Sequence, residues 1–510
     1  MAWSFRDIKA SRGINWQPCF GSYKCMYLIV PLDYDDTKAG YTNIAYIKYE
    51  AKNGNGTEII YNPGGPGGSG VATLMSVKDS LVKSFGPEYS FVSFDPRGVN
   101  NTGPLVLSCG LEENSPSSAS IGEQWAQAKA NSLYCNNYNA KNSTAKYAGT
   151  VANVQDMIYY SKLEQISKGK DPEATKIWYY GVSYGTVIGQ TLAAMYPKRV
   201  GRMILDGNVN GVEHYTGFVP SSILDTDKTF KFFFEYCYEA GPQLCPLAGN
   251  ATSAADVQQR YDAVMEKLEI EPYIRANSTD IVTRDEVERQ IFRAMYSPKT
   301  GFYATAKQVT NLETGNLNEI DEVNEVVSQI TKDYDAQGAA FRGNNVLQMI
   351  TCIDTADNYA VKSLDEFQDG IDQIRSSSEY IYKAFPFNNP LMCNGMKIIP
   401  PKSQLFPGFK KTDTNVPILF INNSADPITP LDSAKKMAEY FNNAGVLTVD
   451  GPGHGYRSVG SVCADKYARS YLKTGSLPKE GTVCEGDSTP KEVLDFGRRT
   501  FSATKVSMRK

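Results

Sequence analysis

The feature that most constrains the fold is a serine between two glycines, where a strand-like segment meets a helix-like one. Residues 177–180 are apolar and aromatic, as expected of a buried strand, and residues 186–195 follow a helical pattern. A turn this sharp needs Gly181 and Gly185 where the backbones pass, and it leaves the Ser183 hydroxyl exposed at the helix start. Such a pentapeptide arises by chance in roughly one glycine-rich chain in four or five. Ser183 is therefore a candidate nucleophile, and the assignment depends on whether the chain also contains a suitable histidine and acid.

Strand and helix patterns alternate on both sides of this junction. Short apolar runs at 58–61, 91–94 and 202–206 each end in glycine, proline, asparagine or aspartate. This alternation is typical of a parallel sheet covered by helices on both faces. The alternating segments 27–32 and 42–49 predict an antiparallel pair at the edge of that sheet. The predicted fold class is α/β, with a mostly parallel sheet flanked by helices.

The alternation of strand and helix patterns divides the chain into three parts. Residues 212–410 are mainly helical in pattern, and the strand and helix alternation resumes after them. We therefore expect a core built from residues 1–211 and 411–510, with residues 212–410 inserted as a helical cap. The basic C-terminal end is expected to be a solvated tail. It carries Arg498, Arg499, Lys505, Arg509 and Lys510.

Two polar residues late in the chain complete a candidate catalytic set. Asp426 follows a strand-like run at 416–422, and His454 lies in a glycine-flanked loop after another run at 445–449. The order serine, aspartate, histidine, each just beyond a strand, is that of the catalytic triads of α/β-hydrolases.

Other residues compete for two of these roles. The chain has only two histidines, and His214 lies among ordinary residues at the start of the predicted cap, so His454 is preferred as the base. For the acid, Asp206 and Asp450 also lie at strand ends, but Asp426 is preferred.

A loop rich in glycine and proline follows the strand at 58–61. Residues 63–68 are all glycine or proline, so their backbone N–H groups are uncovered and suit a phosphate or a developing oxyanion. No Gly-Lys-Ser/Thr follows, which excludes a P-loop, and a plain tight turn is the alternative. Farther on, Asp95 and Arg97 are expected to form a structural ion pair that pins loops near the site.

Composition excludes several function classes. The net charge of −4 with mixed signs argues against nucleic acid or an anionic membrane surface as the main partner. No run of about 18 apolar residues suggests a membrane span. A peptide or small acyl compound is therefore the expected partner, and the sequence does not indicate an oligomeric state.

The ten cysteines indicate disulfides. With no Cys-x-x-Cys motif and two histidines, a zinc site or a redox motif is not expected. The close spacing within two of the pairs suggests pairing in sequence order, against the alternative of reduced core cysteines. The expected pairs are Cys19–Cys25, Cys109–Cys135, Cys237–Cys245, Cys352–Cys393 and Cys463–Cys484. Secretion is favoured, and since the N-terminus lacks an apolar signal region, we expect a signal peptide to have been removed.

Six short motifs together resemble the α/β-hydrolases of the tripeptidyl aminopeptidase and prolyl iminopeptidase group, with a C-terminal region like that of tripeptidyl aminopeptidases. They are Asn-Pro-Gly-Gly-Pro-Gly at 62–67, Phe-Asp-Pro-Arg-Gly at 94–98, Gly-Val-Ser-Tyr-Gly at 181–185, Ile-Thr-Cys-Ile-Asp at 350–354, Asp-Pro-Ile-Thr-Pro at 426–430 and Gly-His-Gly at 453–455. The resemblance spans nearly the whole chain. It implies hydrolysis of an acyl bond, typically with release of residues from a free peptide N-terminus.

This reading assigns roles to individual residues. His454 would accept the proton of Ser183, Asp426 would orient the imidazole, and the backbone N–H groups of Gly65 and Tyr184 would receive the oxyanion. This chemistry needs no metal or organic cofactor.

Recognition of a substrate's ammonium group would need a carboxylate from the cap, with Asp354 as first candidate and Glu213 as second. Two other function classes stay open. One is a carboxylesterase or biosynthetic hydrolase with the same triad. The other is a non-catalytic binding protein on a hydrolase scaffold.

Overall fold

A large twisted sheet forms the centre of the protein in the computed structural model. The structure describes the chain apart from residues 1–3, 55, 104–106, 108, 110–119, 140–143, 275–278, 280, 317–322, 324, 327–345, 382–392, 509 and 510. Within the described residues this sheet has 11 strands in the order β1-β3-β4-β6-β5-β7-β8-β11-β12-β13, with β2 paired to β3. All strands from β6 to β13 in this order run parallel.

The strands are β1 (Ala10–Ser11), β2 (Gln17–Cys19), β3 (Tyr23–Pro31), β4 (Tyr41–Tyr49), β5 (Glu58–Asn62), β6 (Ser90–Phe94), β7 (Ile177–Val182), β8 (Val200–Asp206), β11 (Leu419–Ala425), β12 (Gly445–Pro452) and β13 (Val483–Glu485). A small separate sheet pairs β9 (Tyr273–Ile274) with β10 (Ile281–Val282). The antiparallel pairing of β3 with β4 confirms the pair predicted for the sheet edge.

Helices cover both faces of the main sheet. On one face α3 (Thr150–Ser167), α4 (Tyr184–Met195) and α14 (Leu431–Ala438) share a core with the inward side chains of the strands. On the other face α1 (Gly70–Phe85) and α16 (Val462–Thr474) form a second core. Strands that are buried on both faces consist of consecutive apolar residues, which is why these strands are recognisable in the sequence. The predicted α/β fold is confirmed.

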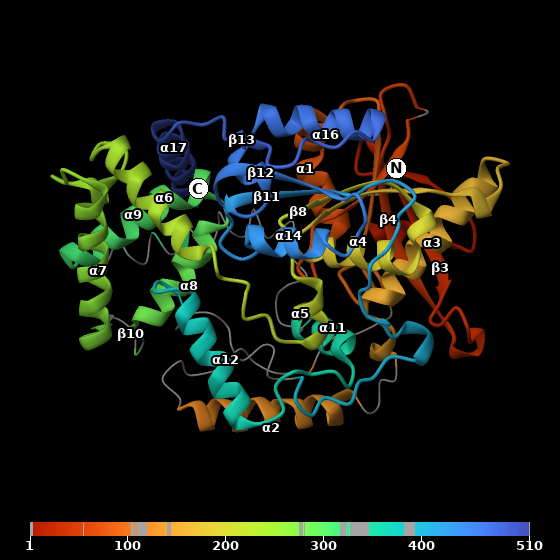
Figure 1. The fold of residues 1–510 in the computed structure, drawn as a ribbon, viewed down its shortest axis with the longest axis horizontal. Coiled ribbons are helices and arrows are strands. Elements are labelled where there is room, and N and C mark those ends of the chain that lie inside the picture. The colour runs from red at the N-terminus through yellow and green to blue at the C-terminus, as the bar shows by residue number, and fades with distance from the viewer. Residues whose placement is uncertain are drawn as a thin grey trace.

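The remaining helices lie mostly to one side of the sheet and below it (Figure 1). They are α2 (Ile121–Asn139), α5 (Gly211–Thr216), α6 (Thr226–Ala240), α7 (Ala254–Ile270), α8 (Arg284–Met295), α9 (Pro298–Thr314), α11 (Val346–Thr355), α12 (Leu364–Ser377), α15 (Tyr456–Val459) and α17 (Pro490–Met508). Helices α6 to α9 pack around a core of their own, rich in phenylalanine. No helix among the described residues is long and apolar enough to cross a bilayer.

The C-terminal segment is a helix packed on the cap, so the expectation of a solvated tail is wrong for the part that the structure describes. Helix α17 lies against α9 and α6, and its Val493 and Leu494 join their core (Figure 1). The stripe formed by Val493, Leu494, Gly497 and Phe501 is buried, while Arg499 is exposed. Arg509 and Lys510 lie outside the described residues.

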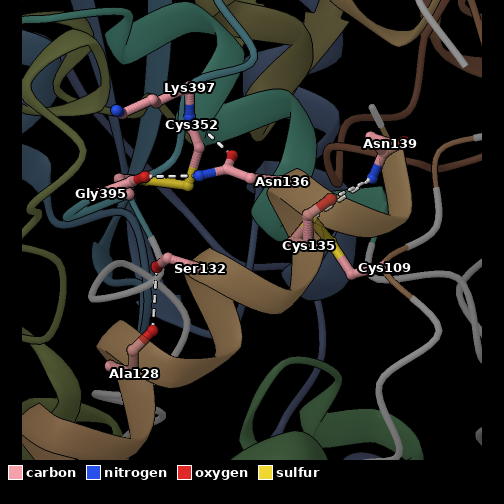
Figure 2. The surroundings of a disulfide bond; sticks show 10 residues. Cys109, Ala128, Ser132, Cys135, Asn136, Asn139, Cys352, Gly395 and Lys397 are labelled. Atoms are coloured by element: carbon pink, nitrogen blue, oxygen red, sulfur yellow. Dashed lines mark hydrogen bonds between the residues drawn. A yellow bond between two sulfur atoms is a disulfide. The ribbon is translucent and has the colours of Figure 1, made fainter. Parts of the chain in front are cut away.

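Helix α2 also lies against the cap, although it precedes the predicted cap segment by more than seventy residues. Trp125 of α2 stacks on Phe367 of α12 with ring centroids 5.8 Å apart. Farther along, the Asn136 side chain donates to the Gly395 carbonyl and accepts from the Lys397 N–H (Figure 2). The domain boundaries at 212 and 410 stay a prediction, and the cap packs against helices from both flanking parts.

All ten cysteines form disulfides, and every predicted pair is confirmed. The bonds are Cys19–Cys25, Cys109–Cys135, Cys237–Cys245, Cys352–Cys393 and Cys463–Cys484. Two of them are joined through the end of α2, since Asn136, next to Cys135, bonds Gly395 and Lys397, which follow Cys393 (Figure 2). Five disulfides indicate that the protein resides in an oxidising compartment.

Candidate active site

The candidate nucleophile lies on a tight turn between β7 and α4. Ser183 has a φ of 57°, a positive value that residues other than glycine seldom adopt. A Cβ at Gly181 would lie 2.4 Å from the carbonyl oxygen of Gly185, and one at Gly185 would lie 2.6 Å from that of Asn62. Both glycines are therefore required by the close approach of the backbones, as the sequence predicts.

His454 and Asp426 form a hydrogen-bonded pair at the carboxyl ends of β11 and β12. His454 Nδ1 lies 3.0 Å and 3.1 Å from the two carboxylate oxygens of Asp426, and Asp426 is fully buried. The carboxylate also accepts the backbone N–H groups of Ile428, Thr429 and Gly455. A neutral imidazole that donates from Nδ1 leaves Nε2 as a proton acceptor, which is the state a general base requires.

The environment shifts the pKa values of this pair in opposite directions. Burial would raise the pKa of Asp426, but the imidazole of His454 and the backbone donors hold it below its usual value. Burial would lower the pKa of His454, whereas the charges of Asp426 and Asp206 raise it above that of a free imidazole. The pair is therefore stabilised as a carboxylate beside a readily protonated imidazole.

The end of β8 brings the candidate nucleophile and base to one place. The Ser183 N–H donates to the carbonyl oxygen of Asp206 at 3.0 Å. A Cβ on the next residue, Gly207, would lie 3.3 Å from Cε1 of His454. Ser183 and His454 thus contact two consecutive residues at the strand end.

The glycine and proline loop after β5 lies directly against the turn that carries Ser183. A Cβ at Gly64 would lie 2.7 Å from Cβ of Ser183 and 3.0 Å from the backbone nitrogen of Tyr184. Tyr184 is the first residue of α4, so its N–H has no acceptor within the helix. Gly65, the next loop residue, has a φ of 119°, which favours glycine. An oxyanion site formed by Gly65 and Tyr184 stays a prediction that this arrangement favours.

The predicted ion pair between Asp95 and Arg97 is wrong. The Arg97 guanidinium pairs instead with Asp156 of α3 at 2.7 Å and is fully buried. Asp95 accepts hydrogen bonds from the Ser69 hydroxyl and the Val71 N–H, which fixes the start of α1, directly after the glycine loop, to the end of β6. The two residues point apart because each side chain is drawn to a different buried partner.

Thr429 is a site residue that the sequence reasoning missed. Its hydroxyl lies 3.1 Å from Nδ1 of His454, and its backbone N–H donates to Asp426. A threonine three residues after a strand-end aspartate is the available signal, because short polar side chains often bond locally in such turns.

The rival acids have other partners. Asp206 bonds through its carboxylate to Tyr180 and Tyr456. Asp450 accepts from the Ser424 hydroxyl. Of the three strand-end aspartates, Asp426 is the one with a hydrogen bond to the imidazole of His454.

The other histidine pairs with the first candidate for amine binding. His214 Nε2 lies 2.8 Å from the carboxylate of Asp354, whose side chain is 3% exposed. The Asp354 carboxylate also accepts from the N–H and the hydroxyl of Thr150, and that hydroxyl contacts Tyr184 Oη. Asp354 therefore lies behind the side chain of the residue that follows Ser183.

Glu213, the second candidate, is partly buried near the start of α5. Its carboxylate accepts from the backbone and hydroxyl of Ser221 and from Nδ2 of Asn210. Burial raises its pKa above the usual value despite these donors. The neighbouring Val212 lines a cavity of about 750 Å³ together with Asn210 and Lys436.

The cap supports the loop that carries His454. The backbone N–H of His454 donates to the carbonyl oxygen of Tyr296, and the Tyr296 ring lies 5.1 Å from the imidazole. Pro298, at the start of α9, packs closely against Gly453. In the part of the chain that the structure describes, no three metal-ligating side chains are grouped together.

Comparison with known proteins finds similarity to hydrolases. Residues 379–484 match the family model described as TAP-like protein. The chain is 24% identical over 503 residues to serine protease Hip1 of Mycobacterium tuberculosis, covering 94% of this chain and 92% of that protein. It is 22% identical over 506 residues to tripeptidyl aminopeptidase of Streptomyces coelicolor, covering 94% and 88%.

A third relative has an esterase name. The chain is 24% identical over 486 residues to carboxylesterase B of Mycobacterium tuberculosis, covering 90% of this chain and 86% of that protein. All three similarities extend across the cap as well as the core. Residues 379–484 are therefore similar to the TAP-like family, and the α/β chain is similar over nearly its whole length to Hip1 and to a tripeptidyl aminopeptidase.

Proposed function

We propose that this serine hydrolase cleaves peptide bonds and releases residues from free peptide N-termini. Ser183 is the nucleophile, His454 is the general base, and Asp426 is the carboxylate that orients His454. The observation that carries the proposal is the buried pair of His454 and Asp426 beside the strand end that also binds the Ser183 backbone. The names of the relatives, a serine protease and a tripeptidyl aminopeptidase, support a peptide substrate.

The mechanism follows from the chemistry of these groups. His454 Nε2 accepts the Ser183 proton as Oγ attacks the carbonyl carbon, and Asp426 stabilises the imidazolium that forms. The N–H groups of Tyr184 and Gly65 receive the oxyanion. The imidazolium then protonates the leaving amine, and water activated by His454 hydrolyses the acyl-enzyme.

Exopeptidase action requires recognition of the substrate's ammonium group. A carboxylate can bind this group strongly in a partly desolvated pocket. Asp354 and Glu213 remain the two candidates, and both already accept hydrogen bonds from within the protein. Asp354 would have to exchange His214 or Thr150 for the substrate, whereas Glu213 is adjacent in sequence to Val212, which lines a cavity.

A fluorophosphonate probe and a substrate panel test the proposal together. The probe should label Ser183, and Ser183→Ala should abolish labelling and turnover. Peptides with free N-termini should be cleaved, and the same peptides with acetylated N-termini should not. Labelling at another serine would exclude the assigned nucleophile.

The same panel identifies the acid that binds the amine. Asp354→Asn and Glu213→Gln are compared on free-amine peptides and on small neutral esters. Loss confined to the peptides, by roughly 30-fold or more, identifies an ammonium contact, since losing a charged partner costs about 2–3 kcal/mol. Equal loss on both substrate types assigns that residue a structural role instead.

A carboxylesterase with the same triad is the second candidate, because one relative has that name. Such an enzyme would hydrolyse neutral esters well and show no preference for a free amine. A binding protein without catalysis would neither react with the probe nor turn over any substrate.

The five disulfides also support secretion of the mature protein. Non-reducing mass mapping of protein recovered from the culture medium or cell exterior should find all five bonds. Recovery of the protein only inside the cell with free thiols would contradict this localisation.

A further inference from the structure

Asp206 bonds to both segments that carry the proposed nucleophile and base. It is the last residue of β8, and its carbonyl oxygen accepts the N–H of Ser183. Its side chain, 1% exposed, points into the protein beneath the His454 loop. There Oδ1 accepts the backbone N–H of Tyr456 at 2.9 Å, and Oδ2 accepts the Tyr180 hydroxyl at 2.7 Å.

The fit between this carboxylate and the loop is tight. A Cβ at Gly455 would lie 3.3 Å from both carboxylate oxygens of Asp206. Gly455 also has a φ of 71°, so the loop needs glycine here for its conformation as well as for space. A Cβ at Gly207, the residue after Asp206, would likewise lie 3.3 Å from Cε1 of His454. The strand end and the His454 loop are therefore closely packed against each other.

We propose that Asp206 is a positioning residue of the reaction, which holds the Ser183 turn and the His454 loop in register and places a second negative charge beneath the imidazole. This inference rests on the proposed roles of Ser183 and His454. It gives Asp206 a task that differs from that of Asp426, because Asp206 accepts the backbone N–H of Tyr456, whereas Asp426 bonds Nδ1 of His454.

The following charged and titratable groups surround this carboxylate among the residues that the structure describes. Tyr180 of β7, Tyr456 and Arg457 of α15, and His454 face Asp206. Burial raises the pKa of Asp206 to about 6, and the hydrogen bonds from Tyr456 and Tyr180 oppose that rise. At neutral pH the group is therefore mostly an anion.

The groups that face His454 define how this charge acts. Asp426 and Thr429 approach Nδ1, and Tyr296 of the cap lies beside the ring. The charge of Asp206 adds to that of Asp426 in raising the pKa of His454. Removing it should lower that pKa and weaken stabilisation of the imidazolium in the transition state.

The pH profile of Asp206→Asn tests the proposal. We expect the acid limb of kcat/KM to move to lower pH by roughly one unit, the lower end of the shift that a nearby charge produces. We also expect the plateau to fall by about 10-fold or more, because the loop is less well held. A lower plateau with an unmoved acid limb would show a structural role and overturn the proposal.

Two further variants complete the experiment. Asp450→Asn is the matched control, because it neutralises a strand-end aspartate that bonds Ser424, and its acid limb should stay in place. Tyr180→Phe keeps the buried ring but removes one donor to Asp206, so more of the carboxylate is protonated at a given pH. Its acid limb should move in the same direction by a smaller amount, and this variant decides the question if Asp206→Asn does not fold.

The proposal and the proposed function fail in different ways. Unmoved acid limbs in both variants, with Ser183 still labelled in the wild-type protein, overturn the positioning role alone. Absence of Ser183 labelling in the wild-type protein overturns the proposed function itself, and with it this inference.

Discussion

The protein contains two buried histidine and aspartate pairs that look alike by distance and burial alone. His454 lies 3.0 Å from Asp426, with side chains 9% and 0% exposed. His214 lies 2.8 Å from Asp354, with side chains 6% and 3% exposed. A search for a close, buried pair would find both.

The difference lies in which ring nitrogen is used and what surrounds the acid. His454 bonds its acid through Nδ1, which leaves Nε2, the nitrogen farther from the backbone, for a proton from Ser183. His214 bonds Asp354 through Nε2, so its far nitrogen is already engaged. Asp354 is further bound to Thr150 at the start of α3, which makes this pair a connection between cap and core. The identity of the bonded nitrogen, rather than proximity, separates the proposed catalytic pair from the structural one.

Removing each histidine gives the largest expected contrast. His454→Ala should lower kcat by about 10⁴-fold or more, since triad members contribute on this scale. His214→Ala should stay within about 10-fold, because its imidazole has no free Nε2 to offer a nucleophile. Steady-state kinetics on one good substrate would measure both. Comparable losses in the two variants would contradict the assignment of His454 as the base.

Two threonine variants should show the opposite order when stability is measured: the pair of His214 and Asp354 should matter more than the pair of His454 and Asp426. Thr150→Val removes the hydroxyl that contacts Asp354 and Tyr184, and both groups are buried. Leaving them short of a partner should cost about 1–3 kcal/mol in the free energy of unfolding. Urea denaturation would measure this loss, with Thr429→Val as the control at the other pair. Loss of stability in Thr429→Val alone would contradict the assignment of the structural role.

The pH dependence of activity reports on the first pair only. The reaction needs neutral His454, and the carboxylates of Asp426 and Asp206 raise its pKa above the usual value of about 6.5. Therefore kcat/KM should rise with pH and reach half of its plateau above pH ~6.5. His214→Ala should leave this midpoint unchanged. A midpoint well below the usual value would mean that burial outweighs the two carboxylates.

The sequence predicted the parts of the molecule that depend on local patterns. Ser183, Asp426 and His454 each follow a strand, and parallel strands bring their carboxyl ends to one edge of the sheet. Cysteine order was equally informative, since all five disulfides join consecutive cysteines. These features need no knowledge of how distant segments pack.

Long-range pairings were beyond the same reasoning. Arg97 pairs with Asp156 and not with its neighbour Asp95, and His214 pairs with Asp354 across 140 residues. No local spacing marks such partners, because they are chosen by the packing of helices onto the sheet. Helix α17 was missed for a related reason: its apolar stripe has meaning only beside the core of α6 and α9. The predicted task of Asp354 in binding an amine likewise depends on a cap packing that the sequence did not specify.

The smallest expected effect concerns Thr429 at the proposed catalytic pair. Nδ1 of His454 has three oxygens within 3.1 Å, two from Asp426 and one from Thr429. Since one N–H cannot donate well to all three, the hydroxyl should act by holding the plane of the imidazole. Thr429→Val, which keeps the shape of the side chain, should lower kcat by about 3- to 10-fold, as loss of one net hydrogen bond of ~1 kcal/mol implies.

The effect of Thr429→Val should appear in kcat and not in KM, because a misaligned base weakens transition-state stabilisation without weakening substrate binding. The acid limb of the pH profile should remain near that of the wild-type protein, since no charge is removed. A rise in KM with kcat unchanged would place Thr429 in contact with substrate. A loss as large as that of His454→Ala would mean that the hydroxyl, and not Asp426 alone, sets the imidazole tautomer.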